Sequence, residues 1–130
     1  MELKHSDVTG AIIGAAFEVH RELGYGFLEK VYQRSMQVEL QQRGLQAEPE
    51  YPIKVHFKGA IVGDYYADLF VERKVIVEVK AAKEYNPKDE AQLLNELKAT
   101  GVEVGLLINF GAEQVEFKRL IFSEQTEATD

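Results

Sequence analysis

The chain has 130 residues, of which 45% are hydrophobic and 28% are charged, so it is long enough to bury the core of one compact domain. It contains no cysteine, which excludes disulfides, zinc–thiolate sites, iron–sulfur clusters and thiol nucleophiles. Its net charge of −7, from 22 acidic and 15 basic residues, counts against indiscriminate binding to nucleic acid, which usually needs a basic surface.

Two helices are expected near the N-terminus. Ser6 is a candidate N-cap, and the apolar residues that follow recur at helical spacing, which predicts an amphipathic helix over about residues 6–22. The Gly24-Tyr25-Gly26 sequence breaks this helix. A second helix is expected over about residues 27–43, and Gly44 suits its C-terminal end.

The middle of the chain changes to the period of two that is typical of strands. Alternating apolar and polar residues predict strands over about residues 53–57 and 62–71, and a short strand rich in β-branched residues follows over 75–81. Two prolines at the start of the first strand favour an edge position. Turns at Lys58-Gly59 and at Glu72-Arg73-Lys74 are short, so we expect an antiparallel meander.

The C-terminal part is expected to add one helix and two strands. Asn86 can cap a helix whose first residue is proline, and this helix is expected to continue to about Thr100, where Gly101 ends it. A buried strand over residues 103–110 is connected through that helix, which favours parallel pairing with its neighbour. A final strand is expected over about residues 115–122.

This order of elements predicts an α/β (α+β) fold with helices packed around one mixed sheet of four or five strands. Residues 1–123 are expected to form a single domain, followed by a polar tail over residues 124–130. No segment approaches the roughly 20 apolar residues that span a bilayer. The N-terminus lacks the layout of a signal peptide, so we expect a soluble, cytoplasmic protein.

The Glu78-Val79-Lys80 sequence carries the clearest chemical signal. Residues two apart in a strand share a face, so Glu78 and Lys80 are expected to point the same way. If the preceding turn closes a hairpin centred on Arg73, Asp68 lies opposite Glu78. Two carboxylates beside an ammonium group suit Mg²⁺ or Mn²⁺, although a surface salt bridge produces the same pattern.

A second constellation lies at the start of the second expected helix. Gly26, Glu29 and Tyr32 recur every third residue and would fall on one side of a helix. Gly26 would allow a close approach of the backbone, and Glu29 would interact favourably with the helix dipole. An ordinary helix start followed by an amphipathic tyrosine explains the same three residues.

The Gly26-x-x-Glu29-x-x-Tyr32 run resembles the signature of the GxxExxY proteins. The resemblance covers about residues 5–122, and its further pieces are Tyr66-Ala67-Asp68-Leu69, 75–81, 90–95, 97–101 and 105–111. These proteins are placed in the PD-(D/E)XK nuclease-like superfamily. The motif after which the superfamily is named has a proline before its aspartate, whereas this chain has Ala67 before Asp68.

The resemblance implies a restriction-endonuclease-like core and a metal-dependent nuclease that hydrolyses DNA phosphodiester bonds with a metal-activated water. It implies that Asp68, Glu78 and Glu29 bind Mg²⁺ or Mn²⁺. Lys80 would assist catalysis, and Gln92 would pack near the lysine or the substrate.

Two alternatives stay open at this point. The same fold is also suited to a non-catalytic module that binds nucleic acid or a protein partner, which the net charge of −7 and the small size favour modestly. A homodimer with paired sites is the other alternative, because one domain of this size offers little surface for recognising a substrate.

Overall fold

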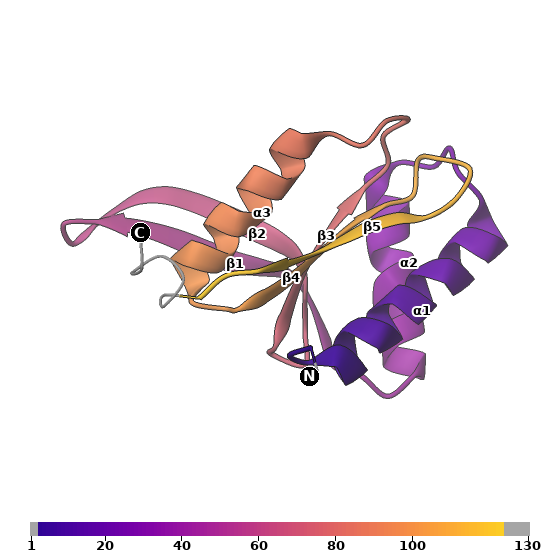
Figure 1. Cartoon of the computed structure of the whole chain (residues 1–130), viewed down its shortest axis with the longest axis horizontal. Coiled ribbons are helices and arrows are strands. Elements are labelled where there is room, and N and C mark those ends of the chain that lie inside the picture. The colour runs from indigo at the N-terminus through magenta and orange to yellow at the C-terminus, as the bar shows by residue number, and fades with distance from the viewer. Residues whose placement is uncertain (1–2, 124–130) are drawn as a thin grey trace.

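The computed structural model describes residues 3–123, so the expected tail over residues 124–130 lies outside the described part (Figure 1). Its elements follow the expected order: α1 (Ser6–Leu23), α2 (Glu29–Gln42), β1 (Ala47–Phe57), β2 (Ala60–Val71), β3 (Val75–Lys80), α3 (Pro87–Thr100), β4 (Val104–Asn109) and β5 (Glu116–Ile121). None of the helices in this part of the chain is long and apolar enough to cross a membrane.

The five strands form one mixed sheet in which spatial order equals chain order. The meander β1–β2–β3 is antiparallel, β4 lies parallel to β3, and β5 returns antiparallel to β4. The parallel pair is joined through α3, as the helical connection predicted. β1 lies at one edge of the sheet, which is the position that its prolines favoured.

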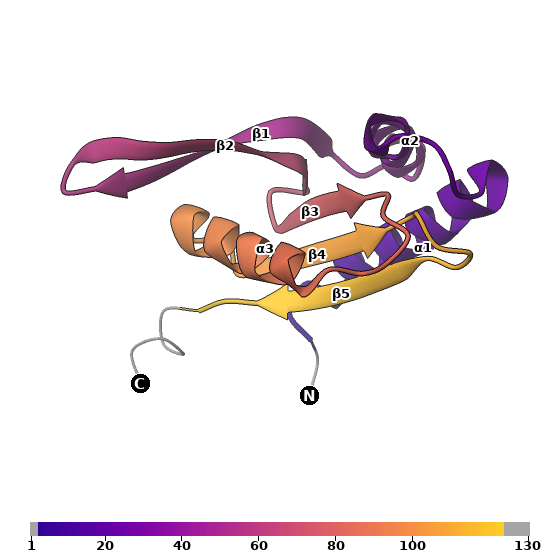
Figure 2. The same cartoon turned by 90° about the horizontal axis from the view of Figure 1, so that it is seen from above.

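The helices cover both faces of the sheet, so the molecule has two cores (Figure 2). Helices α1 and α2 pack on one face, through a cluster that includes Ile12, Tyr32, Met36, Val77 and Leu106. Helix α3 packs on the other face, through a smaller cluster that includes Ile53, Phe70, Ile76, Leu93 and Leu97. Because side chains alternate along a strand, Glu78 and Lys80 share the α3 face with Ile76.

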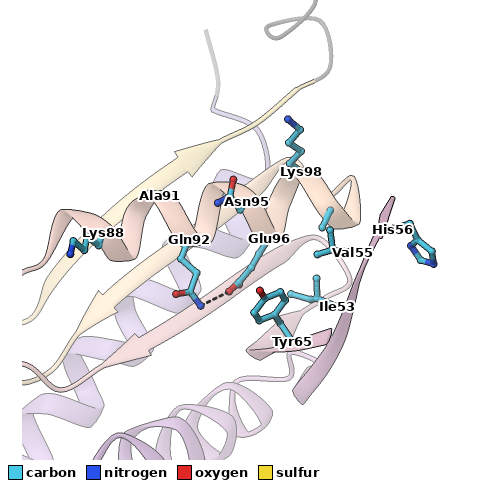
Figure 3. A pocket seen from close by; sticks show the side chains of 11 residues that line it. Ile53, Val55, His56, Tyr65, Lys88, Ala91, Gln92, Asn95, Glu96 and Lys98 are labelled. Atoms are coloured by element: carbon cyan, nitrogen blue, oxygen red, sulfur yellow. Dashed lines mark hydrogen bonds between the residues drawn. The ribbon is translucent and has the colours of Figure 1, made fainter. Parts of the chain in front are cut away.

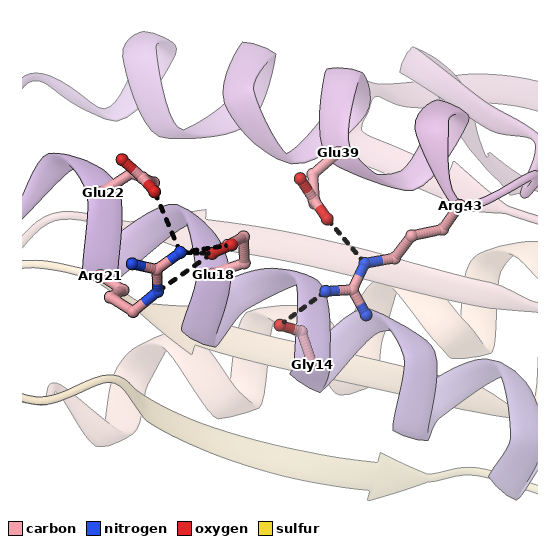
Figure 4. Close-up of polar contacts among 6 residues, drawn as sticks. All are labelled: Gly14, Glu18, Arg21, Glu22, Glu39 and Arg43. Carbon is pink, nitrogen blue, oxygen red and sulfur yellow. Dashed lines mark hydrogen bonds and ion pairs between the residues drawn. The ribbon is translucent and has the colours of Figure 1, made fainter.

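Helices α1 and α2 are also joined by a polar contact (Figure 4). Arg43 lies just after α2. Its guanidinium donates a hydrogen bond to Glu39 Oε2 at 2.7 Å and another to the Gly14 carbonyl of α1 at 3.3 Å. A Cβ at position 14 would lie 2.9 Å from Arg43 Nη1. Gly14 therefore provides the space in which the arginine crosses from one helix to the other.

Three helix ends test the expected caps. Ser6 as an N-cap is wrong: His5 holds that position with a left-handed φ of 55°, and Ser6 is already helical. Asn86 as a cap of α3 is confirmed, because its side chain accepts a hydrogen bond from Lys88 N. Helix α2 begins only at Glu29, and Gly26 lies before it with φ 113°, so the expected shared helical face with Gly26 is wrong.

Candidate active site

The β2–β3 ladder ends next to the two expected acidic residues. Its last pair is Leu69 with Val77, in the register expected for a hairpin centred on Arg73. One step further, Asp68 N donates to Glu78 Oε1 at 3.4 Å, and Val79 N donates to Asp68 Oδ2 at 2.7 Å. The two carboxyl groups therefore meet where the strands part, and each is held by backbone of the opposite strand.

The other edge of β2 is also interrupted at Asp68. Pairing between β1 and β2 skips the position where Glu50 would face Asp68, and Glu50 has a left-handed φ of 51°. The Asp68 carbonyl instead accepts a hydrogen bond from Gln33 Nε2 of α2 at 2.9 Å. Side chains of β3 and α2 thus satisfy the Asp68 backbone, which fixes the position of its carboxylate.

Glu78 faces a second buried carboxyl group, that of Glu96 on α3. Glu78 is only 7% exposed. Burial raises its pKa well above the usual range, and its hydrogen bond to Glu96 and the charge of Asp68 raise the pKa further. Burial also raises the pKa of Glu96. The surroundings of these buried carboxyl groups do not stabilise all of their negative charges. A bound proton or a bound cation would stabilise the site.

One oxygen of Glu96 lacks a donor. Oε2 accepts a hydrogen bond from Gln92 Nε2 at 3.3 Å, whereas buried Oε1 receives none from any N–H or hydroxyl group in the described part of the chain. A proton shared with Glu78, or a cation, is the partner that remains for it. Gln92, which the sequence indicated, is thus connected to the carboxyl cluster of Asp68, Glu78 and Glu96 from α3.

Lys80 is half-buried at the end of β3. Its Nζ lies 3.8 Å from Asp89 Oδ1 in the first turn of α3, and its charge is among the influences that lower the pKa of Glu96. The structure therefore brings Asp68, Glu78, Lys80 and Gln92 to one region between β2, β3 and α3.

Glu29 is placed differently from these residues. It is exposed at the first position of α2, and its side chain makes no hydrogen bond or ion pair within residues 3–123. Gln33, one turn later on the same helix face, contacts Asp68, which directs this face of α2 toward β2. Over the same residues, no group of three or more His, Cys, Asp and Glu side chains is arranged to hold a metal ion.

Tyr32 of the same motif is fully buried and supports the loop before Glu29. Its hydroxyl donates to the Gly24 carbonyl at 2.6 Å and accepts from Phe27 N at 3.2 Å. Its ring stacks on Phe110 of the opposite layer, with ring centres 4.7 Å apart. The tyrosine thus anchors the start of α2 to the end of β4.

The end of β3 is held in place by a residue that the sequence did not single out. The buried Asn109 side chain accepts from Ala82 N at 2.9 Å and donates to the Ala82 carbonyl at 2.9 Å. Gly111 passes so close to this segment that a Cβ there would lie 2.5 Å from Ala82 N. These contacts fix the chain directly after Lys80.

Glu96 was also missed by sequence reasoning. It is four residues after Gln92 and lies between Leu93 and Leu97, the two residues that anchor α3 to the sheet. An acidic residue this close to two core positions is the signal that identifies it, because such a side chain cannot point fully to solvent.

A groove of about 790 Å³ opens between the β1–β2 hairpin and α3 (Figure 3). Tyr65 and Ile53 line it from the hairpin, and Lys88, Gln92 and Glu96 line it from the helix. Because Glu96 belongs to both the groove and the carboxyl cluster, the groove is continuous with the candidate site.

Comparisons with known proteins bear on the family and the fold of the chain. A family model described as the PD-(D/E)XK nuclease superfamily matches residues 6–120. No curated protein matches the chain significantly. Among solved structures, the chain resembles an alkaline exonuclease (LHK-Exo) from Laribacter hongkongensis, with 12% identity and a TM-score of 0.54 over 98% of this chain and 76% of that one.

The chain also resembles the crystal structure of SSO0001, with 16% identity and a TM-score of 0.54. This match covers 75% of the chain and 52% of SSO0001, so the matched part spans about half the length of that protein. At these identities the two structures support the fold, which is consistent with the expected restriction-endonuclease-like core.

Proposed function

The chain belongs to the PD-(D/E)XK nuclease superfamily, and we propose from this premise that it is a metal-dependent nuclease that hydrolyses DNA phosphodiester bonds with a metal-activated water. The observation that carries the proposal is the meeting of Asp68 and Glu78 where β2 and β3 part, with Lys80 two residues further along the same strand face. This geometry places hard oxygen ligands for a metal ion next to the ammonium group of Lys80, which can contact a phosphate.

Asp68 and Glu78 are the residues that we propose hold Mg²⁺ or Mn²⁺, with Glu29 as a third ligand from α2. The chemistry of the site fits such an ion, because the carboxyl groups are crowded and Glu96 Oε1 is buried without a donor. When bound, a divalent ion lowers the pKa of a coordinated water and neutralises charge on the scissile phosphate.

The chain's own residues position the reacting groups. The backbone N–H groups of Val79 and Asp68 restrict the two carboxylates, so that little reorganisation is needed at the moment of reaction. The Lys80 ammonium group orients the attacking water or stabilises the charge that develops on the phosphoryl oxygens. The attacking water loses a proton to solvent as its oxygen bonds to phosphorus. The bond from phosphorus to the leaving sugar oxygen breaks, and that oxygen takes up a proton from solvent.

Cleavage of plasmid and single-stranded DNA with Mg²⁺, Mn²⁺ or EDTA tests the proposal. We expect Lys80→Ala to reduce the rate by roughly 100-fold or more, because a preorganised charge contact is lost. Lys74→Ala, at an exposed lysine in the β2–β3 turn, is the matched control and is expected to retain the rate. Equal rates for wild type and Lys80→Ala would contradict the proposal. So would DNA binding without cleavage under every metal, which would indicate the non-catalytic alternative.

A further inference from the structure

The groove is formed by a part of the sheet that extends beyond β3. β2 pairs with β3 only over Leu69–Val71, so most of β2 pairs with β1 alone as a hairpin, and α3 runs along it (Figure 2). Ile53 lines this space and belongs to the same core cluster as Leu93 of α3. The groove is thus an open channel between the hairpin and α3, and it reaches the carboxyl cluster at Glu96.

Tyr65 presents an aromatic ring to this channel. Figure 3 shows the ring on the hairpin side, facing Gln92 and Glu96 of α3. A Cβ at Gly63 would lie 2.9 Å from Tyr65 Cε2, so the ring rests against a position that has no side chain. Because Tyr65 is 52% exposed, its ring is available to a ligand. A ring in this situation is a platform on which a nucleobase can stack.

The channel is less acidic than the rest of the molecule. The chain has a net charge of −7, whereas the described residues that line the channel include two lysines, Lys88 and Lys98, and one acidic residue, Glu96. The two lysines are ten residues apart on α3, which corresponds to about 15 Å along a helix axis. This distance spans more than one phosphate of a nucleic acid strand. The lining of the channel therefore offers lysine side chains and an aromatic ring next to the carboxyl cluster.

The combination selects an unpaired strand. In a duplex, each base face is covered by its neighbours, so Tyr65 can reach one only in a strand that is not paired. The groove volume of about 790 Å³ lies in the range of pockets that hold small ligands. It therefore suits one or two nucleotides and is too small for a double helix.

From these observations we infer that the groove binds a single-stranded segment of nucleic acid, with a base stacked on Tyr65 and phosphates near Lys88, and directs it to Asp68 and Glu78. This inference rests on the proposed nuclease function, because it names the form of substrate that reaches that site.

Fluorescence anisotropy of the full chain with a labelled single-stranded DNA of about 12 nucleotides tests the inference. EDTA in the buffer prevents cleavage, and a duplex and an RNA of the same sequence are the comparison ligands. We expect the single strand to bind more tightly than the duplex. Tyr65→Ala should weaken binding by roughly 10-fold, because a stacking partner is lost, and Tyr65→Phe should retain it. Tyr66→Ala is the matched control, since Tyr66 is 61% exposed on the other face of the same strand.

The salt dependence of the same binding tests the lysine contact. Lys88→Ala is expected to reduce the slope of log affinity against log salt by roughly 0.7, which corresponds to one phosphate on a single strand. Lys74→Ala changes the net charge equally but lies outside the groove, so its slope should equal that of wild type.

Unchanged affinity in Tyr65→Ala, or tighter binding of the duplex, would overturn the inference. Cleavage that depends on Lys80 but not on Tyr65 would overturn the inference about the groove and would leave the nuclease proposal intact. Single-strand binding that depends on Tyr65, in a protein that cleaves nothing, would support the groove and overturn the nuclease proposal. Tighter binding of RNA than of DNA would support the groove and replace DNA as the substrate.

Discussion

At the scale of single residues, Glu78 shows how function competes with stability. It occupies a position in β3 whose neighbours Val77 and Val79 are fully buried, and an apolar residue there would extend the α3 core. Instead, burial and the nearby Glu96 and Asp68 raise its pKa. A carboxyl group with a raised pKa in the folded protein destabilises the fold at every pH above its ordinary pKa of 4.5, because folding must retain or take up a proton.

Replacement of this carboxyl group should therefore stabilise the protein in EDTA. We expect Glu78→Gln to raise the free energy of unfolding at pH 8 by at least about 1.4 kcal/mol, the equivalent of one pKa unit. The difference should shrink toward pH 5, because the penalty is absent below the ordinary pKa of the carboxyl group. Urea denaturation at the two pH values measures this, and the same variant should lose nuclease activity.

Glu113→Gln is the control for this measurement, because Glu113 is exposed. It should change the free energy of unfolding by less than about 0.5 kcal/mol at either pH. A loss of stability in Glu78→Gln at pH 8 would mean that Glu78 is ionised and stabilised by a partner, contrary to the direction of its pKa shift.

Gly111 is the residue whose lack of a side chain matters most near the site. A Cβ there would lie 2.6 Å from Ala81 C and 2.5 Å from Ala82 N. Both are backbone atoms, which cannot move aside without a cost in free energy. We expect Gly111→Ala to lower the free energy of unfolding by about 1–3 kcal/mol. It should also reduce cleavage, because the segment that follows Lys80 is displaced. Denaturant unfolding and the cleavage rate measure the two effects.

Gly10→Ala is the opposite case and the matched control. Gly10 is in the second turn of α1, and nothing lies within 4 Å of the position that a Cβ would take. Since alanine favours a helix by about 1 kcal/mol over glycine, this variant should be more stable than wild type and equally active. If both variants behaved alike, the close approach at Gly111 would not be what constrains the chain.

At the scale of elements, Tyr32 connects α2 to the rest of the molecule. Its hydroxyl holds the Gly24 carbonyl and Phe27 N, on either side of the loop that precedes Glu29. Tyr32→Phe keeps the ring that stacks on Phe110 and removes only these bonds. We expect a loss of about 0.5–1.5 kcal/mol in the free energy of unfolding, with faster amide hydrogen exchange at Phe27.

Tyr25→Phe is the control, because Tyr25 is exposed in the same loop. It should alter neither the stability nor the exchange rate at Phe27. If exchange at Phe27 were unchanged in Tyr32→Phe, the hydroxyl would not be what orders the loop before α2.

Element positions were predictable where local chemistry decides them. The β2–β3 register followed from a turn centred on Arg73, and Asn86 capped α3 as its position suggested. The start of α2 was not predictable, because the chain over Gly26 is held by the distant contacts of Tyr32 and adopts a φ that no helix allows. Periodicity alone extends the helix over this loop.

At the scale of the whole molecule, the strand residues of the candidate site followed from local pattern, whereas of the α3 residues only Gln92 was indicated and Glu96 was missed. Strand alternation and turn geometry place Asp68, Glu78 and Lys80 from sequence. The spacing of Glu96 between Leu93 and Leu97 indicates that it is partly buried, but its place beside Glu78 depends on how α3 lies across the sheet. The family is shown at the level of the superfamily, and the assignment to the GxxExxY proteins stays a prediction.

Metal binding should be visible as a change in global stability, since the proposed ligands come from β2, β3 and α2. An ion that binds the folded protein but not the unfolded one stabilises it by about 1.4 kcal/mol when its concentration is ten times its Kd. For a chain of this size we expect Mn²⁺ or Mg²⁺ to raise the Tm by roughly 3–8 °C, reversibly with EDTA. Differential scanning fluorimetry measures this shift.

Substitution of the proposed ligands distinguishes this site from binding elsewhere on an acidic surface. Asp68→Asn and Glu78→Gln should each abolish the metal-dependent rise in Tm. Glu29→Gln should only reduce this rise, because Glu29 lies on α2, outside the strand pair that carries the other two proposed ligands. Glu113→Gln removes the same charge at an exposed position and should retain the full rise. A full rise in Asp68→Asn would place the ion elsewhere, and a full rise in Glu29→Gln would remove Glu29 from the ligand set.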